Sequence, residues 1–208
     1  MSIEPSQQYR GVAYLNSGYR RGLDVLISLL LFVPVHFVLA LAWLAARLRG
    51  QTSFLYIQER IGRGGHSFRI YKVRTIRINH PSAQEFTHTP NDLLPLGAFL
   101  RRLRVDELPQ IWNVLRGEMS WIGPRPEVPF HYHQCAQALM GYEDRQLVLP
   151  GITGWAQIND LRGEVQELEE MSRRVKHDLY YIEHWSLWFD VRIILATVLK
   201  IFFSKKAW

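Results

Sequence analysis

The longest apolar stretch of the chain, residues 25–46, lies near its beginning and contains no formally charged side chain. About 20 apolar residues are enough for a helix to cross a bilayer, and the stretch is too long for the apolar region of a cleavable signal peptide. Pro34 lies near its middle, where it removes a helix hydrogen bond. The pattern therefore predicts a membrane-inserted helix with a kink.

Arginines flank this stretch on both sides. Arg20 and Arg21 precede it, and Arg47 and Arg49 follow it. Cytoplasmic ends of membrane helices are enriched in Lys and Arg, so the matched flanks allow both ends to lie in the cytoplasm. By length alone, a single kinked span is the simpler interpretation. A re-entrant helix that turns back at Pro34 is the alternative.

Two strand patterns follow, at residues 54–61 and 67–76, joined by a glycine-rich turn. No Gly-Lys-Ser/Thr sequence follows the glycines, so the turn is not a P-loop. Side chains alternate between the two faces of a strand. One face of the second strand carries Phe68, Ile70, Lys72 and Arg74. Two cations are therefore expected to project together from this strand.

The second half of the chain contains helix patterns of two kinds. Residues 93–103 suit an amphipathic helix, and residues 164–181 suit a charged helix with a mostly solvated face. In residues 186–205, apolar side chains recur at near-helical spacing with lysines close by, which suits a helix at the lipid interface or one packed on the core. The polar segment at residues 80–92 is predicted to form a loop or lid.

Composition narrows the class of protein only slightly. The 208 residues are enough for one domain and a membrane anchor. With 25 Lys and Arg against 19 Asp and Glu, the net charge of +6 suits nucleic acid, anionic lipid or a phosphorylated substrate. Cys135 is the only cysteine, which excludes an intrachain disulfide and gives no support to a cysteine-based zinc site. His131 and His133 are spaced like possible metal ligands, but two histidines alone do not identify a metal site.

The strongest chemical signal is DELPQ at residues 106–110. Pro109 fits the first turn of a helix, so Asp106 and Glu107 are expected at a helix N-terminus. The positive end of the helix dipole keeps a carboxylate ionised and attracts phosphate, although an ordinary helix cap is the simpler explanation. Downstream, a Gly-Pro-Arg-Pro turn holds Arg125 between two prolines, and a guanidinium suits a phosphate.

Several longer motifs occur together. They are Arg20, Arg21 and Asp24 before the apolar stretch, QERIG (58–62), FRIYKVRT (68–75), DELPQIWNVLRGEMSWIGPRP (106–126), PGITGWAQIN (150–159) and DLYYIEHWSLWFDVRI (178–193). In content and order they resemble the monotopic polyprenol-phosphate phosphoglycosyltransferases, also called bacterial sugar transferases. The chain is close to the family's minimal catalytic unit. One departure is Val33, where relatives often have a serine before the proline.

This resemblance implies an α/β fold: a small mixed domain with an N-terminal re-entrant membrane helix and amphipathic interfacial helices. Residues 1–50 would form the N-terminal segment and re-entrant helix, and residues 51–208 the catalytic domain. The protein would be monotopic and inserted in one leaflet of the bacterial inner membrane. The catalytic domain would face the cytoplasm.

The implied reaction transfers a sugar-1-phosphate from a UDP-sugar to undecaprenyl phosphate. It gives undecaprenyl-diphosphate-sugar and UMP and starts bacterial glycoconjugate synthesis. By the same resemblance, Asp106 is the nucleophile that forms a covalent phosphosugar intermediate, and Mg²⁺ is held by Glu107 and Asp106, with Glu107 as metal ligand or assisting base. The expected substrate-binding residues are Lys72, Arg74, Arg125, Arg145 and Asp178. For Asp178, a buried structural partner is an equal alternative.

Two other functions stay open. A basic, non-enzymatic scaffold at the membrane surface explains the charge and the amphipathic ends but gives the DELPQ and GPRP sequences no purpose. A lipid-diphosphate hydrolase would use the same residues with water as the final acceptor. Nucleic acid is not an expected partner, and the identity of the sugar and the formation of a homodimer stay open.

Overall fold

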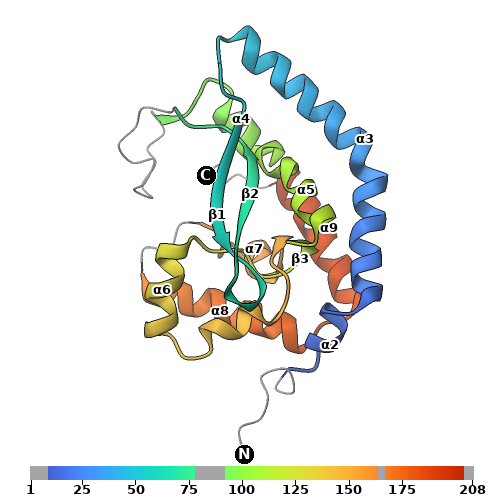
Figure 1. Ribbon diagram of the computed structural model, residues 1–208, viewed down its shortest axis with the longest axis vertical. Helices are drawn as coiled ribbons and strands as arrows, with labels where there is room; N and C mark the ends of the chain where they lie inside the picture. The colour runs from blue at the N-terminus through green and yellow to red at the C-terminus, as the bar shows by residue number, and fades with distance from the viewer. Residues whose placement is uncertain (1–8, 78–91, 164–166, 204–208) are drawn as a thin grey trace, which may run out of the picture.

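The computed structural model describes residues 9–77, 92–163 and 167–203. Short strands alternate with helices, and a long N-terminal helix runs along one side of the domain (Figure 1). This confirms the expected mixed α/β fold, while most of the expected loop or lid at residues 80–92 lies outside the described residues. The order of elements is α2 (Val12–Leu15), α3 (Gly18–Leu48), β1 (Leu55–Ile61), η1 (Arg63–Gly65), β2 (Ser67–Val73), α4 (Gly97–Arg102), η4 (Val105–Gln110), α5 (Ile111–Arg116), β3 (Ser120–Ile122), α6 (Pro129–Ala138), η5 (Tyr142–Leu147), β4 (Gly151–Thr153), α7 (Trp155–Ile158), α8 (Leu168–Glu183) and α9 (Leu187–Phe203).

Helix α3 is one continuous helix that contains Pro34. The Ser17 side chain caps its first turn by accepting a hydrogen bond from the Arg20 amide at 3.2 Å. The helix axis bends along its course (Figure 1), as expected where a proline removes a backbone donor. The structure therefore has one bent helix rather than two helices separated by a break.

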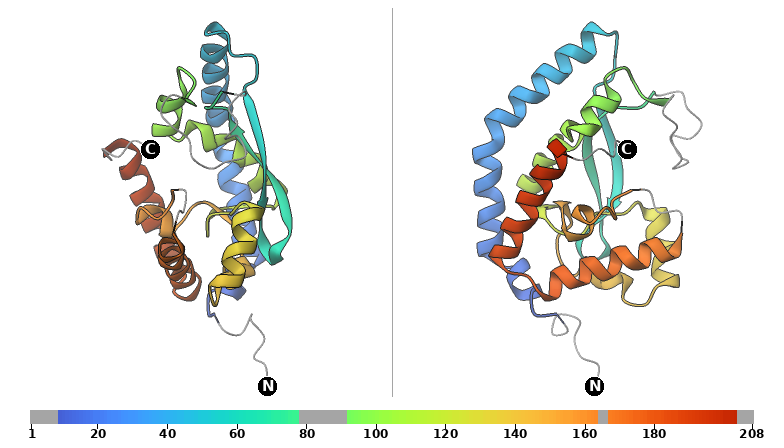
Figure 2. Two further views of the ribbon diagram at one scale, coloured as in Figure 1. Left: turned by 90° about the vertical axis from the view of Figure 1, so that its left-hand side faces the viewer. Right: turned by 180° about the vertical axis from the view of Figure 1, so that it is seen from behind.

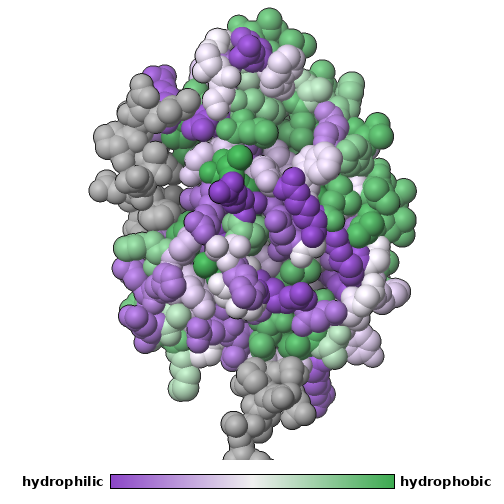
Figure 3. Space-filling view, in the orientation of Figure 1, coloured by the Kyte–Doolittle hydropathy of each residue, from purple (hydrophilic) through white to green (hydrophobic). Residues whose placement is uncertain are grey.

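Most of the apolar surface of α3 is exposed. Its exposed large side chains are Tyr19, Leu26, Leu29, Leu30, Leu31, Val33, Phe37, Val38, Leu41, Trp43, Leu44 and Leu48. By length and composition, α3 is the one helix among the described residues that could cross a membrane, and only 17% of its most apolar window is buried. Figure 3 shows hydrophobic residues gathered along the right-hand side of the molecule, over α3. Contiguous apolar surface of this kind is typical of a segment that contacts a membrane.

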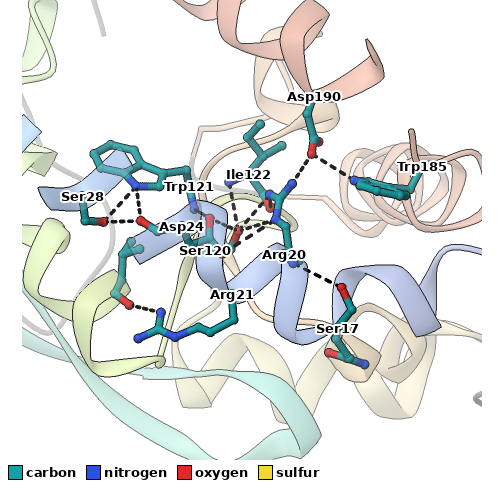
Figure 4. A network of polar contacts seen from close by, with 12 residues as sticks. Ser17, Arg20, Arg21, Asp24, Ser28, Ser120, Trp121, Ile122, Trp185 and Asp190 are labelled. Atoms are coloured by element: carbon teal, nitrogen blue, oxygen red, sulfur yellow. Dashed lines mark hydrogen bonds and ion pairs between the residues drawn. The ribbon is translucent and has the colours of Figure 1, made fainter. Parts of the chain in front are cut away.

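A buried polar network fixes the N-terminal end of α3 to the domain (Figure 4). Arg20 forms an ion pair with Asp190 of α9 and donates to the hydroxyl of Ser120, on β3, at 2.9 Å. Asp24 accepts from the same hydroxyl at 3.0 Å. Arg21 donates to two carbonyls at the end of α5. Both arginines are therefore bonded within the protein, which the flanking-charge pattern does not reveal.

The C-terminal half of α3 packs on the same domain. Ala42 lies in a buried cluster with Val73 of β2, Leu100 of α4 and Val105 of η4. Between these two attachments, Phe32 and His36 also lie against Trp112 of α5. One side of the helix therefore contacts the domain along its length while the other is exposed, and the right-hand view of Figure 2 shows α3 along one edge of the molecule.

Strands β1 and β2 form the antiparallel hairpin expected from the sequence, in register from Leu55 opposite Val73. In the connecting turn, Gly64 and Gly65 have φ angles of 68° and 77°, a left-handed conformation that favours glycine. The hairpin packs along η4. It therefore brings the basic strand against the DELPQ sequence.

Strands β3 and β4 form a second, parallel pair, with Ser120 opposite Gly151 and Ile122 opposite Thr153. The sequence does not predict this pair, because strands of three residues are too short to display alternation. A Cβ atom at Gly151 would lie only 2.0 Å from the amide nitrogen of Gly123. The close approach of the GPRP and PGITG backbones therefore depends on glycine.

Helices α8 and α9 confirm the last two helix patterns. Ile182 of α8 and Ile193 of α9 are fully buried in the main core cluster, together with Ile122. The opposite face of α9 is exposed and carries Leu187, Trp188, Ile194, Leu195, Val198, Leu199, Phe202 and Phe203. One face of α9 therefore packs on the core, and the other presents apolar side chains outward.

Candidate active site

Asp106 and Glu107 lie in the first turn of η4, a 3₁₀ helix that contains Pro109 and leads directly into α5. The expected helix start is confirmed, with a 3₁₀ rather than an α-helical first turn. Arg104, just before η4, has a φ of 55°, which is uncommon for a residue other than glycine. This tight entry turns the Arg104 side chain back toward Glu107.

Glu107 is buried and bound by three cations. Its Oε1 lies 3.1 Å from Arg125 Nη1 and 3.6 Å from Lys72 Nζ, and its Oε2 lies 3.2 Å from Arg104 Nη1. Burial alone would favour the neutral acid, but the three cations outweigh it and lower the pKa of Glu107 to about 2. Glu107 is therefore ionised at neutral pH, with both oxygens engaged.

Asp106 is only partly buried, and its carboxylate makes no hydrogen bond or ion pair with any residue in the described ranges. Burial and the adjacent charge of Glu107 raise the pKa of Asp106 to about 6, against the opposing charges of Lys72 and Arg101. Asp106 is thus mostly ionised at pH 7, and its oxygens are free to attack an electrophile.

Lys72 projects from β2 toward the two acids, as the sequence predicts. Burial lowers the pKa of Lys72 to about 8, with Arg125 and Arg60 adding to the effect and Glu107 opposing it. The ammonium group is therefore still mainly charged at neutral pH. This positive charge can therefore offset negative charge at the site.

Arg74 is not brought to the acids, contrary to the expected shared face with Lys72. Its Nε donates to Ser53 Oγ at 3.3 Å, and its guanidinium lies over the Tyr56 ring, 5.4 Å from the centroid. The strand ends at Val73, so the alternation on which the expectation rests stops before Arg74.

Arg101 and Arg104 complete the cation group, and sequence reasoning does not single them out. Arg101, on α4, donates to Thr75 Oγ1 at 2.9 Å, and its charge is one of those that oppose the rise in the pKa of Asp106. Arg104 pairs with Glu107. Both lie in an arginine-rich run whose spacing does not distinguish site cations from solvated ones.

Arg125 projects from the GPRP turn between two prolines, as expected. The turn is tied to β4, because the Gly123 amide donates to the Thr153 carbonyl at 2.9 Å. The Arg125 guanidinium reaches Glu107. The predicted phosphate-binding arginine therefore lies beside the acidic pair.

Arg145 and Asp178 form a buried ion pair next to the GPRP turn. Arg145 Nε donates to Asp178 Oδ2 at 2.8 Å, and the two side chains are only 2% and 1% exposed. The expected direct contact of these residues with substrate does not fit this placement, because their charges are paired inside the protein. Of the two interpretations of Asp178, the buried partner is the one that the geometry supports.

No group of three or more His, Cys, Asp and Glu side chains is placed to hold a metal ion in the part of the chain that the structure describes. Mg²⁺ often takes only one or two carboxylates, with substrate phosphates and waters completing its shell. Asp106 offers a free carboxylate, whereas both oxygens of Glu107 are engaged. The residues therefore fit Mg²⁺ held by Asp106 and substrate oxygens, and fit poorly the expected role of Glu107 as metal ligand or base.

Chemically, the site joins an unengaged carboxylate to a group of ordered cations. A carboxylate can act as a nucleophile toward phosphorus, and fixed cations stabilise the charge that develops in phosphoryl transfer. The arrangement is therefore chemically suited to phosphoryl transfer through a carboxylate nucleophile.

Comparison with known proteins agrees with this chemistry. Residues 15–204 match the family model described as bacterial sugar transferase. A UDP-glucose:undecaprenyl-phosphate glucose-1-phosphate transferase of Escherichia coli (strain K12) is 40% identical over 196 residues, which cover 93% of this chain and 42% of the relative. A UDP-N-acetylgalactosamine-undecaprenyl-phosphate N-acetylgalactosaminephosphotransferase of Aeromonas hydrophila is 39% identical, with 86% of this chain and 42% of the relative covered.

A third relative is nearer in length. A UDP-glucose:undecaprenyl-phosphate glucose-1-phosphate transferase of Caulobacter vibrioides is 39% identical over 181 residues, 86% of this chain and 68% of the relative. The chain therefore spans less than half the length of the first two relatives and about two thirds of the third. The match of the family model over nearly the whole sequence shows that the chain belongs to the bacterial sugar transferase family.

Proposed function

We propose that the protein transfers a sugar-1-phosphate from a UDP-sugar to undecaprenyl phosphate, as the step that starts a bacterial glycoconjugate. The observation that carries this proposal is the contrast between the two adjacent acids. Among the described residues, the Asp106 carboxylate has no hydrogen-bond or ion-pair partner, while Glu107 is paired with Arg125, Lys72 and Arg104. The names of the relatives, which couple a UDP-sugar to undecaprenyl phosphate, support the choice of substrates.

In the first step, a carboxylate oxygen of Asp106 attacks the phosphorus attached to the sugar. The bond from that phosphorus to the bridging oxygen breaks, and UMP leaves with the bridging oxygen and its electron pair. In the second step, a phosphate oxygen of the lipid attacks the same phosphorus, and the Asp106 carboxylate leaves unchanged. Each step is one displacement, and no external oxidant or base is needed.

The cations reduce the repulsion between two anions. A carboxylate that approaches a diphosphate meets like charge, so positive groups fixed before the substrate arrives lower the barrier. Arg125 and Lys72 would contact the diphosphate oxygens, and Glu107 would hold both cations in place through its ion pairs with them. Glu107 is thus an organiser of the cations, because its low pKa leaves it no proton to give or take.

We include Mg²⁺ as the expected cofactor, with Asp106 as its protein ligand. When bound, the ion would neutralise charge on the diphosphate and stabilise the departing phosphate of UMP. The same carboxylate would remain the nucleophile through its other oxygen.

For the membrane, we propose that α3 enters one leaflet of the bacterial inner membrane and returns, with the catalytic domain in the cytoplasm. A spanning helix would place its two ends on opposite sides of the bilayer. Here Arg20, near one end, and Ala42, near the other, both pack on the same domain. This double attachment favours the re-entrant alternative over a kinked single span.

The test measures UMP release from UDP-sugars by the purified protein in lipid, with and without undecaprenyl phosphate. The transferase should release UMP in proportion to lipid phosphate and, without the acceptor, should acquire the mass of one phosphosugar. A hydrolase would turn over without lipid phosphate, and a non-enzymatic scaffold would release no UMP. Because relatives are named for glucose, N-acetylgalactosamine and galactose, these three donors come first.

The variant Asp106→Asn should fold but lose both turnover and the phosphosugar mass, because an amide supplies no anionic oxygen. Circular dichroism and thermal unfolding against the parent provide the folding control. Normal turnover by this variant would exclude the covalent role of Asp106.

A further inference from the structure

The backbone of the GPRP turn is held at four successive carbonyls. Each accepts a hydrogen bond from a different group, and the donors lie on three separate elements. The pairs are Gly151 N to Pro124 O at 2.9 Å, Arg145 Nη2 to Arg125 O at 3.0 Å, Arg60 Nη1 to Pro126 O at 3.1 Å, and Ile61 N to Glu127 O at 2.8 Å. Since two prolines also fix φ in this turn, the backbone at Arg125 has almost no freedom.

Two of the four donors are arginine side chains. Arg60 is half-buried and also donates to Gln58 Oε1 at 2.7 Å, whereas Arg145 is buried and held by carboxylates. Arg145 is bound through Nε to Asp178 and lies 3.5 Å from Glu127. Glu127 in turn pairs with Arg174 of α8 at 2.7 Å. Burial would favour neutral Glu127, but these arginines lower its pKa to about 2. Glu127 is therefore ionised, and its ion pairs with Arg145 and Arg174 lie next to the backbone of the turn.

We infer that Arg145 is a positioning residue for the reaction, which holds the Arg125 backbone so that the Arg125 guanidinium meets Glu107 and the donor diphosphate, and that Asp178 orients Arg145. The inference rests on the proposed function, in which the Arg125 side chain contacts the donor diphosphate. It assigns Arg145 and Asp178 an effect that passes through Arg125, and neither residue touches the substrate.

The guanidinium fork explains why the residue is an arginine. Its planar N–H groups point in fixed directions, so Arg145 can bind the Asp178 carboxylate through Nε and the Arg125 carbonyl through Nη2. A lysine ammonium on a flexible stem keeps the charge but cannot reproduce both bonds. Arg145→Lys therefore keeps the net charge of the cluster unchanged but removes the pair of directed hydrogen bonds.

The experiment is a double-mutant cycle on kcat/KM for UMP release. Arg145→Lys should lower kcat by about tenfold to a hundredfold with little change in KM, because a small displacement of a charge-stabilising group acts mainly on the chemical step. In an Arg125→Met background, Arg145→Lys should have less than about a twofold effect, since the group it positions is gone. Equal losses in both backgrounds would overturn the inference.

Arg174→Lys is the matched control. Arg174 is buried and paired with the same cluster, but it does not contact the Arg125 carbonyl. Arg174→Lys should lower the unfolding temperature by about as much as Arg145→Lys does. In the cycle with Arg125→Met, it should change kcat/KM by the same factor in both backgrounds. If Arg145→Lys fails to fold, Asp178→Asn replaces it, because this change keeps Arg145 and removes only its orienting charge.

A second measurement does not depend on the reaction. In protein labelled with ¹⁵N-arginine and held in lipid nanodiscs, the Arg125 Nε–H signal is assigned by its loss in Arg125→Met. It should shift and broaden in Arg145→Lys, while the signal of Arg20, in its separate network, stays in place. An unchanged Arg125 signal would overturn the inference even if turnover falls. If the parent releases no UMP at all, the proposed function fails, and this signal still decides the positioning role.

Discussion

At the scale of single residues, two neighbouring carboxylates are placed in opposite states. Glu107 is surrounded by cations and has a pKa of about 2, whereas burial and its charged neighbour raise the pKa of Asp106 to about 6. A pair of acids whose environments separate their pKa values is a pattern that assigns different roles to the two members. Here the weaker acid is the one with free oxygens, and it is therefore the better nucleophile.

These values predict a bell-shaped pH profile for the first half-reaction. Asp106 acts in its charged form, so activity should fall as the pH drops through about 6. Lys72 also acts in its charged form, so activity should fall as the pH rises through about 8. The measurement is kcat/KM for UMP release across this range, which reports ionisations of the free enzyme.

The variant Lys72→Arg serves as the control for the upper limb. An arginine stays charged across the whole range, so the fall above about pH 8 should disappear, even if the maximum is lower. A profile whose upper limb is unchanged in this variant would mean that another group sets it.

Glu107→Gln should lower kcat by about a hundredfold, comparable to the loss of one charge-stabilising group. Without the carboxylate, Arg125, Lys72 and Arg104 repel one another and leave their positions. The midpoint of a Mg²⁺ titration should nevertheless stay within about twofold of the parent, because the carboxylate oxygens are already engaged.

Glu59→Gln provides the matched control for Glu107→Gln, since it removes one charge from an exposed position on β1 and should leave kcat unchanged. A large shift of the Mg²⁺ midpoint in Glu107→Gln would restore Glu107 as a metal ligand.

At the scale of elements, α3 is the segment whose behaviour is hardest to infer from its residues. Its helix is continuous through Pro34, so the proline bends the segment without ending it. The bent helix contacts the same domain near both of its ends, through Arg20 and Ala42.

Pro34→Leu should restore the missing hydrogen bond and favour a spanning helix, which moves the N-terminus to the outer side. The measurement uses a reporter cysteine at Ser6 in a Cys135→Ser background, with an impermeant thiol reagent applied to intact cells. The parent should be shielded and the Pro34→Leu variant labelled.

Asp190→Ala separates orientation from anchoring in the same assay. It should leave the reporter shielded while lowering the unfolding temperature, because it removes one of the two carboxylates that pair with buried Arg20 and leaves only Asp24, at 3.7 Å. Labelling of the parent would show that α3 spans, and the re-entrant assignment would have to be withdrawn.

The sequence predicts those elements whose signal is local. The apolar length of α3, the alternation and glycines of the hairpin, and the proline after the acidic pair each lie within a few residues, and all three elements are confirmed. The pairing of β3 with β4 and the contact of Arg145 with the Arg125 carbonyl depend on segments 20 or more residues apart. No spacing rule connects such segments, so these contacts could not be predicted.

At the scale of the whole molecule, most of the exposed large apolar side chains in the described part of the chain lie on α3 and α9. Both helices meet at the Arg20–Asp190 ion pair, so their positions are linked. Apolar side chains on α9 would rest among lipid head groups and acyl chains. The active site would then be held at the level where a lipid phosphate is found.

Leu195→Gln combined with Leu199→Gln tests this role of α9. These side chains are 58% and 57% exposed, so the change should not disturb the core. We expect the apparent KM for undecaprenyl phosphate to rise by about fivefold or more, because α9 would bind the membrane surface more weakly. The rate at which the phosphosugar mass forms without lipid phosphate should stay the same.

Arg173→Gln, at an exposed position on the charged helix α8, is the control and should change neither quantity. A loss of phosphosugar formation in the α9 variant would instead point to damage at the active site.

The ion pair between Arg20 and Asp190 also sets an order of events during synthesis. The two residues are 170 positions apart, and a bacterial ribosome adds roughly 5–20 residues per second. For about 10 to 30 s, therefore, α3 has left the ribosome while its partner does not yet exist. If α3 inserts while the chain is being made, its placement in the bilayer is set in that interval, by its own bend and flanking arginines. The ion pair then stabilises a placement of α3 that was set before the pair could form.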